Sequence, residues 1–159
     1  MSNPILDPMK GNVDMSFNLL RKFLDRCPTE FWQRKWGKWP VWQQFYHMLS
    51  AVFLFNPLEL KEPLPVSVSN DVQNLKVVGT NPISIEEMDS CLKIAFGHTT
   101  AYLDSLNDAE LGKINEKVKT IMNIDWTHAS TILMIVAHNL YHIGIFDAGL
   151  REMKLDGVF

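Results

Sequence analysis

The stretch Thr131–Phe146, TILMIVAHNLYHIGIF, decides the fold, because it is the longest apolar stretch of the chain and contains no charged residue. It is shorter than the roughly 20 residues that a membrane-spanning helix needs. The two histidines and the asparagine within it would also be costly to place in lipid. The sequence therefore predicts a buried helix here, extending from about residue 127 to 153.

Three further segments have the apolar spacing of helices that bury one face. They cover about residues 11–26, 40–55 and 84–106. Pro28 ends the first of them, because the residue before a proline is disfavoured in a helix. Pro40 suits the first turn of the second helix. Ser84 and Glu87 form a capping-box pattern at the start of the third, so the chain is expected to contain four long helices.

The segments between these helices indicate how the helices connect. Residues 57–82 contain four prolines, and so long a loop is uncommon in a compact domain unless it has a purpose. A long connection can cross a bundle and allow two helices to run parallel. In the next connection, residues 107–126, we predict a short helix over Asp108–Lys119. The predicted fold class is all-α: one domain, residues 1–159, forming an up-down-down-up four-helix bundle with a crossover between its second and third helices.

Composition limits the classes of function that suit this chain. Hydrophobic residues make up 47% of its 159 residues and charged residues 21%, and its net charge is -3 at pH 7. These are values of a folded globular protein, without the basic pattern that nucleic-acid binding requires. Cys27 and Cys91 are far apart and form no CxxC motif, and no signal peptide is visible. We therefore expect a cytoplasmic protein with neither a nucleic acid nor a membrane as partner.

His138 and His142 are polar residues within the apolar stretch Thr131–Phe146, where a buried side chain needs a polar partner. A spacing of four residues places both rings on one helix face, one turn apart. That face is mostly apolar and is expected to point inward, since it also carries Thr131, Met134, Ile135, Ile145 and Gly149. Burying an unsatisfied polar group costs about 1–3 kcal/mol. A metal ion would satisfy both rings, and so would hydrogen bonds to neighbouring helices; the pair by itself does not choose between these interpretations.

His47 favours the metal interpretation, because it lies in the middle of the second predicted helix and is expected to point inward. Three histidines from two helices would form a facial set that leaves coordination positions open. The predicted metal ligands are therefore His47, His138 and His142. His98 lies off the inner stripe of its helix, and His128 is nearly three turns from His138. We predict that both lie outside the site, His128 as a surface residue.

Three motifs of the chain occur in a recognisable order: PTEFW at 28–32, VWQQFYH at 41–47 and HNLYHIG at 138–144. In these motifs, and in length and helix order, nearly the whole chain resembles the DinB/YfiT-like superfamily of metal-dependent helical bundles. The resemblance implies a divalent metal ion, zinc or nickel most often, on His47, His138 and His142, and it implies a homodimer. Ile145 departs from the family pattern, since many relatives carry a glutamine there, and this weakens the transfer of any substrate.

The same resemblance implies a metal-dependent enzyme in which the ion activates a nucleophile. The expected classes are an S-transferase that uses a low-molecular-weight thiol and a hydrolase, each acting on a small-molecule substrate. The alternatives are a non-catalytic bundle that binds a metal or small ligand, for instance under stress, and a purely structural dimer with empty histidines. The sequence assigns no catalytic residue. Gln43, Gln44, Tyr102 and Tyr141 are candidates to orient ligands, and packing is the simpler interpretation of each.

Overall fold

Helices form nearly all of the regular structure, as the sequence predicts. The computed structural model describes residues 3–61 and 64–159. The elements of these residues, in chain order, are α1 (Leu6–Arg26), α2 (Thr29–Gln33), β1 (Lys35–Trp36), β2 (Trp39–Pro40), α3 (Val41–Phe55), α4 (Asn70–Gln73), α5 (Ile85–Asp104), α6 (Glu116–Met122) and α7 (His128–Glu152). The two short strands pair as one antiparallel hairpin. The prediction of an all-α protein is confirmed.

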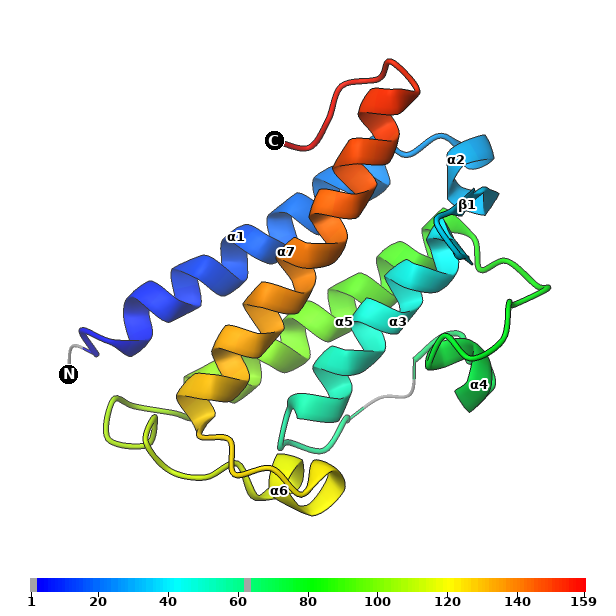
Figure 1. Ribbon diagram of the computed structural model, residues 1–159. Helices are drawn as coiled ribbons and strands as arrows, with labels where there is room; N and C mark the ends of the chain where they lie inside the picture. The colour runs from blue at the N-terminus through cyan, green and yellow to red at the C-terminus, as the bar shows by residue number, and fades with distance from the viewer. Residues whose placement is uncertain (1–2, 62–63) are drawn as a thin grey trace.

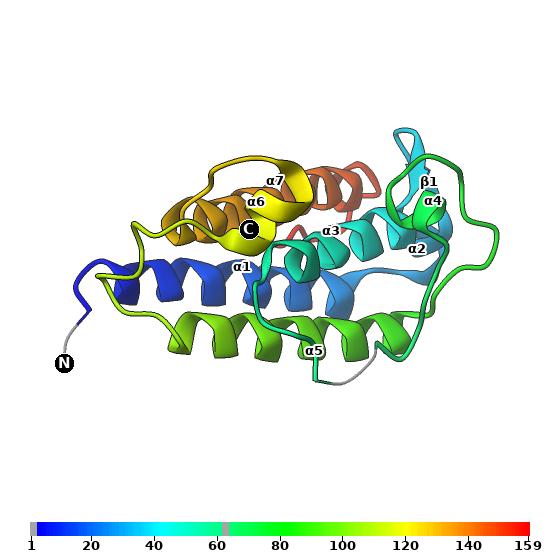
Figure 2. The same cartoon turned by 90° about the horizontal axis from the view of Figure 1, so that it is seen from below.

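The four long helices α1, α3, α5 and α7 lie side by side (Figure 1, Figure 2). α1 packs against α5 and α7, and α3 packs against the same two helices. Between them the ring of Phe23 stacks 4.6 Å from that of Phe146 and 5.9 Å from that of Phe45, measured between centroids. All three side chains are fully buried. Because such rings bury a large apolar area, this cluster forms the centre of the core.

Hydrogen bonds at the two ends of α5 establish its direction relative to α3. The indole N–H of Trp32 donates to the carbonyl of Ile83 at 2.7 Å, which places the start of α5 beside α2 and the start of α3. The amide of Asn56, just after α3, donates to the carbonyl of His98 at 2.9 Å, late in α5. The two helices therefore run in the same direction, and the connection that contains α4 returns along α3 (Figure 1).

α5 and α7 begin where the sequence predicts, α5 with the predicted capping box and α7 with a cap by Thr127. Ser84 Oγ accepts from the N–H of Glu87 at 3.2 Å, and the Glu87 carboxylate accepts from the N–H of Ser84 at 2.9 Å. Thr127 Oγ1 accepts from the N–H of Ser130 at 3.1 Å. Each of these side chains satisfies an N–H that has no partner within its own helix. The predicted helix starts near residues 84 and 127 are confirmed.

The start of α1 differs from the prediction, since the helix begins at Leu6 and not near Gly11. Pro8 lies in the first turn, where a missing N–H removes no bond of the helix. The carboxylate of Asp108 accepts from the N–H groups of Ile5 and Leu6, at 3.2 and 2.9 Å. A residue distant in sequence thus caps this helix, and local sequence could not reveal it.

The short helix in the connection before α7 also lies elsewhere than predicted. It occupies Glu116–Met122 and not Asp108–Lys119, so the predicted range was wrong. The backbone of Leu111 and Lys113 accepts hydrogen bonds from the first residues of α7, at 3.0 and 2.9 Å, which excludes a helix there. Asn115 then caps α6 with its side chain. Backbone hydrogen bonds between residues 111–113 and the start of α7 therefore outweigh the helix preference of the local sequence.

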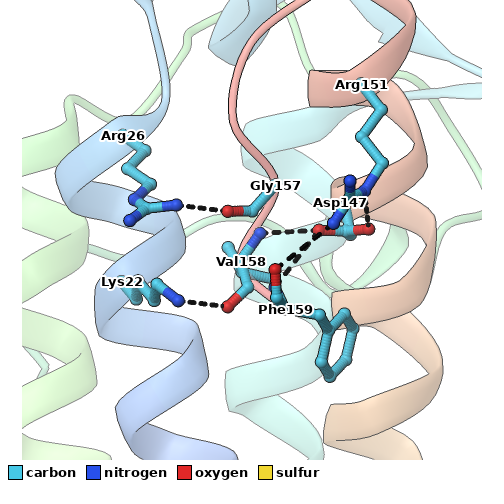
Figure 3. A network of polar contacts seen from close by, with 7 residues as sticks. All are labelled: Lys22, Arg26, Asp147, Arg151, Gly157, Val158 and Phe159. Carbon is cyan, nitrogen blue, oxygen red and sulfur yellow. Dashed lines mark hydrogen bonds and ion pairs between the residues drawn. The ribbon is translucent and has the colours of Figure 1, made fainter.

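Residues 153–159 fold back onto α1 and α7 (Figure 3). The carboxylate of Asp147 in α7 accepts from the N–H of Val158 at 2.6 Å. From α1, Lys22 donates to the Val158 carbonyl at 2.6 Å. The side chain of Val158 is fully buried. This segment therefore ties the first long helix to the last.

Among the described residues, α7 is the one helix whose length and apolar content would suit a membrane span. The core helix of a folded protein meets the same criteria. Here Ile135, Ile143 and Phe146 of α7 are fully or almost fully buried within the protein. The composition of α7 is accordingly weak evidence for a membrane location.

Candidate metal centre

α7 places His138 and His142 one turn apart, as their spacing predicts. Their ring centroids are 4.8 Å apart and the ring planes are almost perpendicular, at 89°. His142 is buried and His138 is half-buried. The remaining residues of the predicted inward stripe are buried or half-buried as well: Thr131, Met134, Ile135, Ile145 and Gly149. The stripe therefore points inward and carries both imidazoles with it.

His47 approaches this pair from α3. Its ring centroid lies 5.4 Å from that of His138 and 5.7 Å from that of His142. One ligand nitrogen from each of the three rings lies within 4.8 Å of the other two. Metal–nitrogen bonds of about 2.0–2.1 Å hold nitrogens up to roughly 4 Å apart, so small rotations of the rings close the remaining gap. The three side chains are thus close enough to hold a metal ion.

A backbone carbonyl orients the ring of His47. The carbonyl oxygen of Gln73, in α4, lies 2.9 Å from Nδ1 of His47. Because a carbonyl can only accept, the proton of the neutral ring lies on Nδ1, and this tautomer leaves the lone pair of Nε2 free. Metal-ligating histidines commonly donate their second N–H to such an acceptor, which fixes tautomer and orientation. Sequence reasoning missed this contact, since a backbone carbonyl has no residue-type signal.

The rings of His138 and His142 are neutral at pH 7. Burial, with smaller contributions from the rings of His138 and His47, lowers the pKa of His142 to about 3. Burial and the neighbouring His47 lower the pKa of His138 to about 4. A neutral imidazole has the lone pair that a metal requires, so no proton must be displaced from these rings at neutral pH.

The buried nitrogen Nδ1 of His142 has no hydrogen-bond partner in the part of the chain that the structure describes. Leaving a buried polar atom unsatisfied costs about 1–3 kcal/mol. An ion bound through Nδ1 would satisfy this atom, whereas no hydrogen bond of the described residues does so. The donor set therefore fits a divalent metal.

The two other histidines lie outside this cluster, as predicted. The ring of His98 packs on Phe53 at 5.7 Å between centroids. Nδ1 of His128 lies 2.6 Å from the hydroxyl of Tyr102, and burial lowers the pKa of this histidine. His128 is half-buried, so its prediction as a surface residue was wrong. The reason is the contact with Tyr102, which the spacing along α7 does not reveal.

Three of the four candidates for orienting ligands form their hydrogen bonds with groups other than the three clustered histidines. Gln43 donates to one carbonyl in α4 and one after it, and Gln44 donates to two carbonyls of the β1–β2 hairpin. Tyr102 is fully buried and bonds to a histidine outside the cluster. Tyr141 differs, because it is 65% exposed and its ring centroid lies 5.2 Å from that of His142. Of the four, Tyr141 is the one whose ring packs against the cluster.

Comparison of the chain with models of protein families, with curated proteins and with solved structures finds no match. The DinB-like resemblance of its motifs accordingly stays a prediction. A function for this protein has to be argued from the geometry of the three histidines and from the groups around them.

Proposed function

We propose that this chain binds one divalent metal ion through His47, His138 and His142 and is a DinB-like, metal-dependent protein. The observation that carries the proposal is the convergence of three imidazoles, with one ligand nitrogen of each within 4.8 Å of the others. The hydrogen bond from His47 to the Gln73 carbonyl supports it, because it leaves Nε2 available as a ligand. The neutral state of the other two rings supports it as well.

The proposal includes the predicted up-down-down-up four-helix bundle. Its support is the shared direction of α3 and α5, which a crossover connection requires. Asp108, just after α5, accepts from the N–H of Leu6 at 2.9 Å. The start of α1 therefore lies at the end of α5, and these two helices run in opposite directions. A bundle of this order brings α3 and α7 together, and those are the two helices that carry the histidines.

The absence of charged side chains on α3 and on residues 128–146 of α7 favours an anionic ligand. His47, His138 and His142 would hold a divalent ion, which would supply Lewis acidity toward a water or a thiol. α3 has no charged residue, and α7 has none from His128 to Phe146. The helices therefore leave the charge of an ion uncompensated, which attracts a thiolate. We propose on this basis S-transfer from a low-molecular-weight thiol, or hydrolysis, with a small-molecule substrate.

The second candidate is a non-catalytic bundle that binds a metal or a small ligand. What favours it is the lack of any Asp, Glu, Lys or Arg on α3 and on residues 128–146 of α7 that could act as a general acid or base. Turnover of an electrophile with a panel of thiols separates the two candidates. Turnover that depends on the metal supports the enzyme, and metal binding without turnover supports the binder.

Metal analysis of protein purified without a histidine tag or chelating resin tests the proposal. We expect about one ion per chain, with zinc or nickel as the first candidates, and a lower Tm after chelation. A ligand that binds only the native state stabilises it by about 2.7 kcal/mol at 100 times its Kd. Protein that contains no ion and gains no thermal stability from either metal would contradict the proposal.

We also propose a homodimer in which two copies pack through the outward face of α7. This face exposes Leu133 by 60% and Tyr141 by 65%, and it carries no charge from His128 to Phe146. A two-fold interface sets one patch against itself, so an uncharged patch avoids contacts between like charges. Sedimentation should give twice the chain mass of 18.3 kDa. Leu133→Lys should give monomers. Ile121→Lys, at a 51% exposed site on α6, is the control and should remain a dimer. A monomeric wild type would contradict the proposal.

A further inference from the structure

Gln43 of α3 holds the backbone around α4 through three hydrogen bonds. Its Nε2 donates to the carbonyl oxygens of Val72 and Val77, at 2.8 Å each. Its Oε1 accepts from the N–H of Gly79 at 2.9 Å. The side chain is fully buried, so these bonds form away from water, where a lost partner is not replaced. One amide therefore fixes the chain on both sides of Gln73.

Gln73 is also the residue whose carbonyl accepts from His47. α4 has no buried residue of its own, so its position depends on the contacts that α3 provides. The segment lies directly on α3, because a Cβ at Gly79 would overlap the ring of Trp42. The placement of the Gln73 carbonyl is thus set by side chains of α3, the helix that also carries His47.

We infer that Gln43 is a positioning residue for the metal centre, acting on His47 through the backbone of residues 72–79. This inference rests on the proposed function. With the amide of Gln43 in place, the Gln73 carbonyl keeps the proton of His47 on Nδ1 and leaves Nε2 as the ligand. Without it the carbonyl shifts, and the ring of His47 is free to rotate and to exchange tautomers. A ligand that must be ordered during binding holds a metal less tightly.

Gln44 provides a matched control. It is the next residue of α3, it is buried, and its Nε2 also donates to two backbone carbonyls, those of Trp36 and Trp39 at 2.9 and 3.0 Å. These carbonyls belong to the β1–β2 hairpin, which forms no hydrogen bond with His47 among the described residues. Loss of the Gln44 amide should therefore cost similar bonds without affecting the metal centre.

The test compares Gln43→Met with Gln44→Met, since methionine keeps the length of the side chain and removes the amide. Zinc affinity is measured by competition with a chromophoric chelator. Gln43→Met should weaken zinc binding by about tenfold, the smallest loss of metal affinity that is typical when a hydrogen-bond partner of a metal ligand is removed. Gln44→Met should weaken it by less than about twofold. In the metal-free protein, ¹⁵N NMR should show one tautomer of His47 in wild type and in Gln44→Met, and a mixture in Gln43→Met.

Equal zinc affinities of the two variants, with one tautomer of His47 in both, would overturn the inference. If Gln43→Met does not fold, Gly79→Ala displaces the same segment through the ring of Trp42, and Gly97→Ala on α5, which has open space around it, is its control. Equal zinc affinities of that pair would overturn the inference in the same way. Wild-type protein that binds neither zinc nor nickel would overturn the proposed function, while the NMR comparison, made without metal, still decides whether Gln43 fixes the ring of His47.

Discussion

The His142→Ala variant is expected to bind zinc or nickel more weakly than wild type by more than about 100-fold. Removing a hydrogen-bond partner of a metal ligand weakens binding by up to about 100-fold, and the loss of a ligand itself should exceed that. His142 supplies the most buried of the three rings, and the two that remain lie on different helices and cannot form a facial set. Competition titration with a chromophoric chelator measures the affinity. Metal analysis of the purified variant should find no retained ion.

His98→Ala is the control for this variant. His98 is half-buried and packs on Phe53, away from the three histidines. Its loss should leave the metal content unchanged, and added zinc should raise the Tm of His98→Ala as it does that of wild type. Added zinc should leave the Tm of His142→Ala unchanged. If His142→Ala retains the metal content of wild type, the ligand assignment is wrong.

The Phe146→Ala variant is expected to lose about 3–5 kcal/mol of the free energy of unfolding. Phe146 is fully buried, and its ring stacks on Phe23 at 4.6 Å and on Phe45 at 5.9 Å between centroids. Removing it opens a cavity at the point where α1, α3 and α7 meet. Urea denaturation of metal-free protein, followed by circular dichroism, measures the change without any contribution from an ion.

Phe159→Ala provides the comparison for that loss, because Phe159 is 65% exposed. Its substitution should change the free energy of unfolding by no more than about 0.5 kcal/mol. Phe146→Leu should lie between the two, since leucine fills part of the cavity. A loss for Phe146→Ala as small as that for Phe159→Ala would show that the three rings do not form the centre of the core.

The sequence allowed the long helices to be predicted because their signals are local. Ser84 and Glu87 satisfy N–H groups of the same turn, and the apolar stripe of residues 131–149 repeats with the period of one helix. The start of α1 and the position of α6 could not be predicted in this way. Asp108 caps α1 although it lies 102 positions away from Leu6 in the sequence. The backbone of Lys113 forms a hydrogen bond with the start of α7.

The same distinction applies to the candidate site. His138 and His142 could be placed on one inward face from their spacing, and His47 from its position in an apolar helix. Their convergence depends on the packing of α3 against α7, which the motifs indicated only through the DinB-like resemblance. Gln43 could be named from the sequence as a candidate to orient ligands. Its partners after α3 and the Gln73 carbonyl could not be predicted, because that connection has no periodic pattern that would place its backbone.

The contacts of residues 153–159 have a consequence for how the protein is made. The hydrogen bond of Lys22 with Val158 joins residues 136 positions apart, and that of Arg26 with Gly157 joins residues 131 positions apart (Figure 3). Contacts between residues so distant in sequence form only when a long loop closes. Loop closure costs conformational entropy, so these contacts stabilise the chain late in folding. α1 packs mainly against α5 and α7, so most of its apolar face has no partner on the ribosome until the second half of the chain has emerged. During synthesis the first helix therefore exposes apolar side chains that favour aggregation and proteolysis.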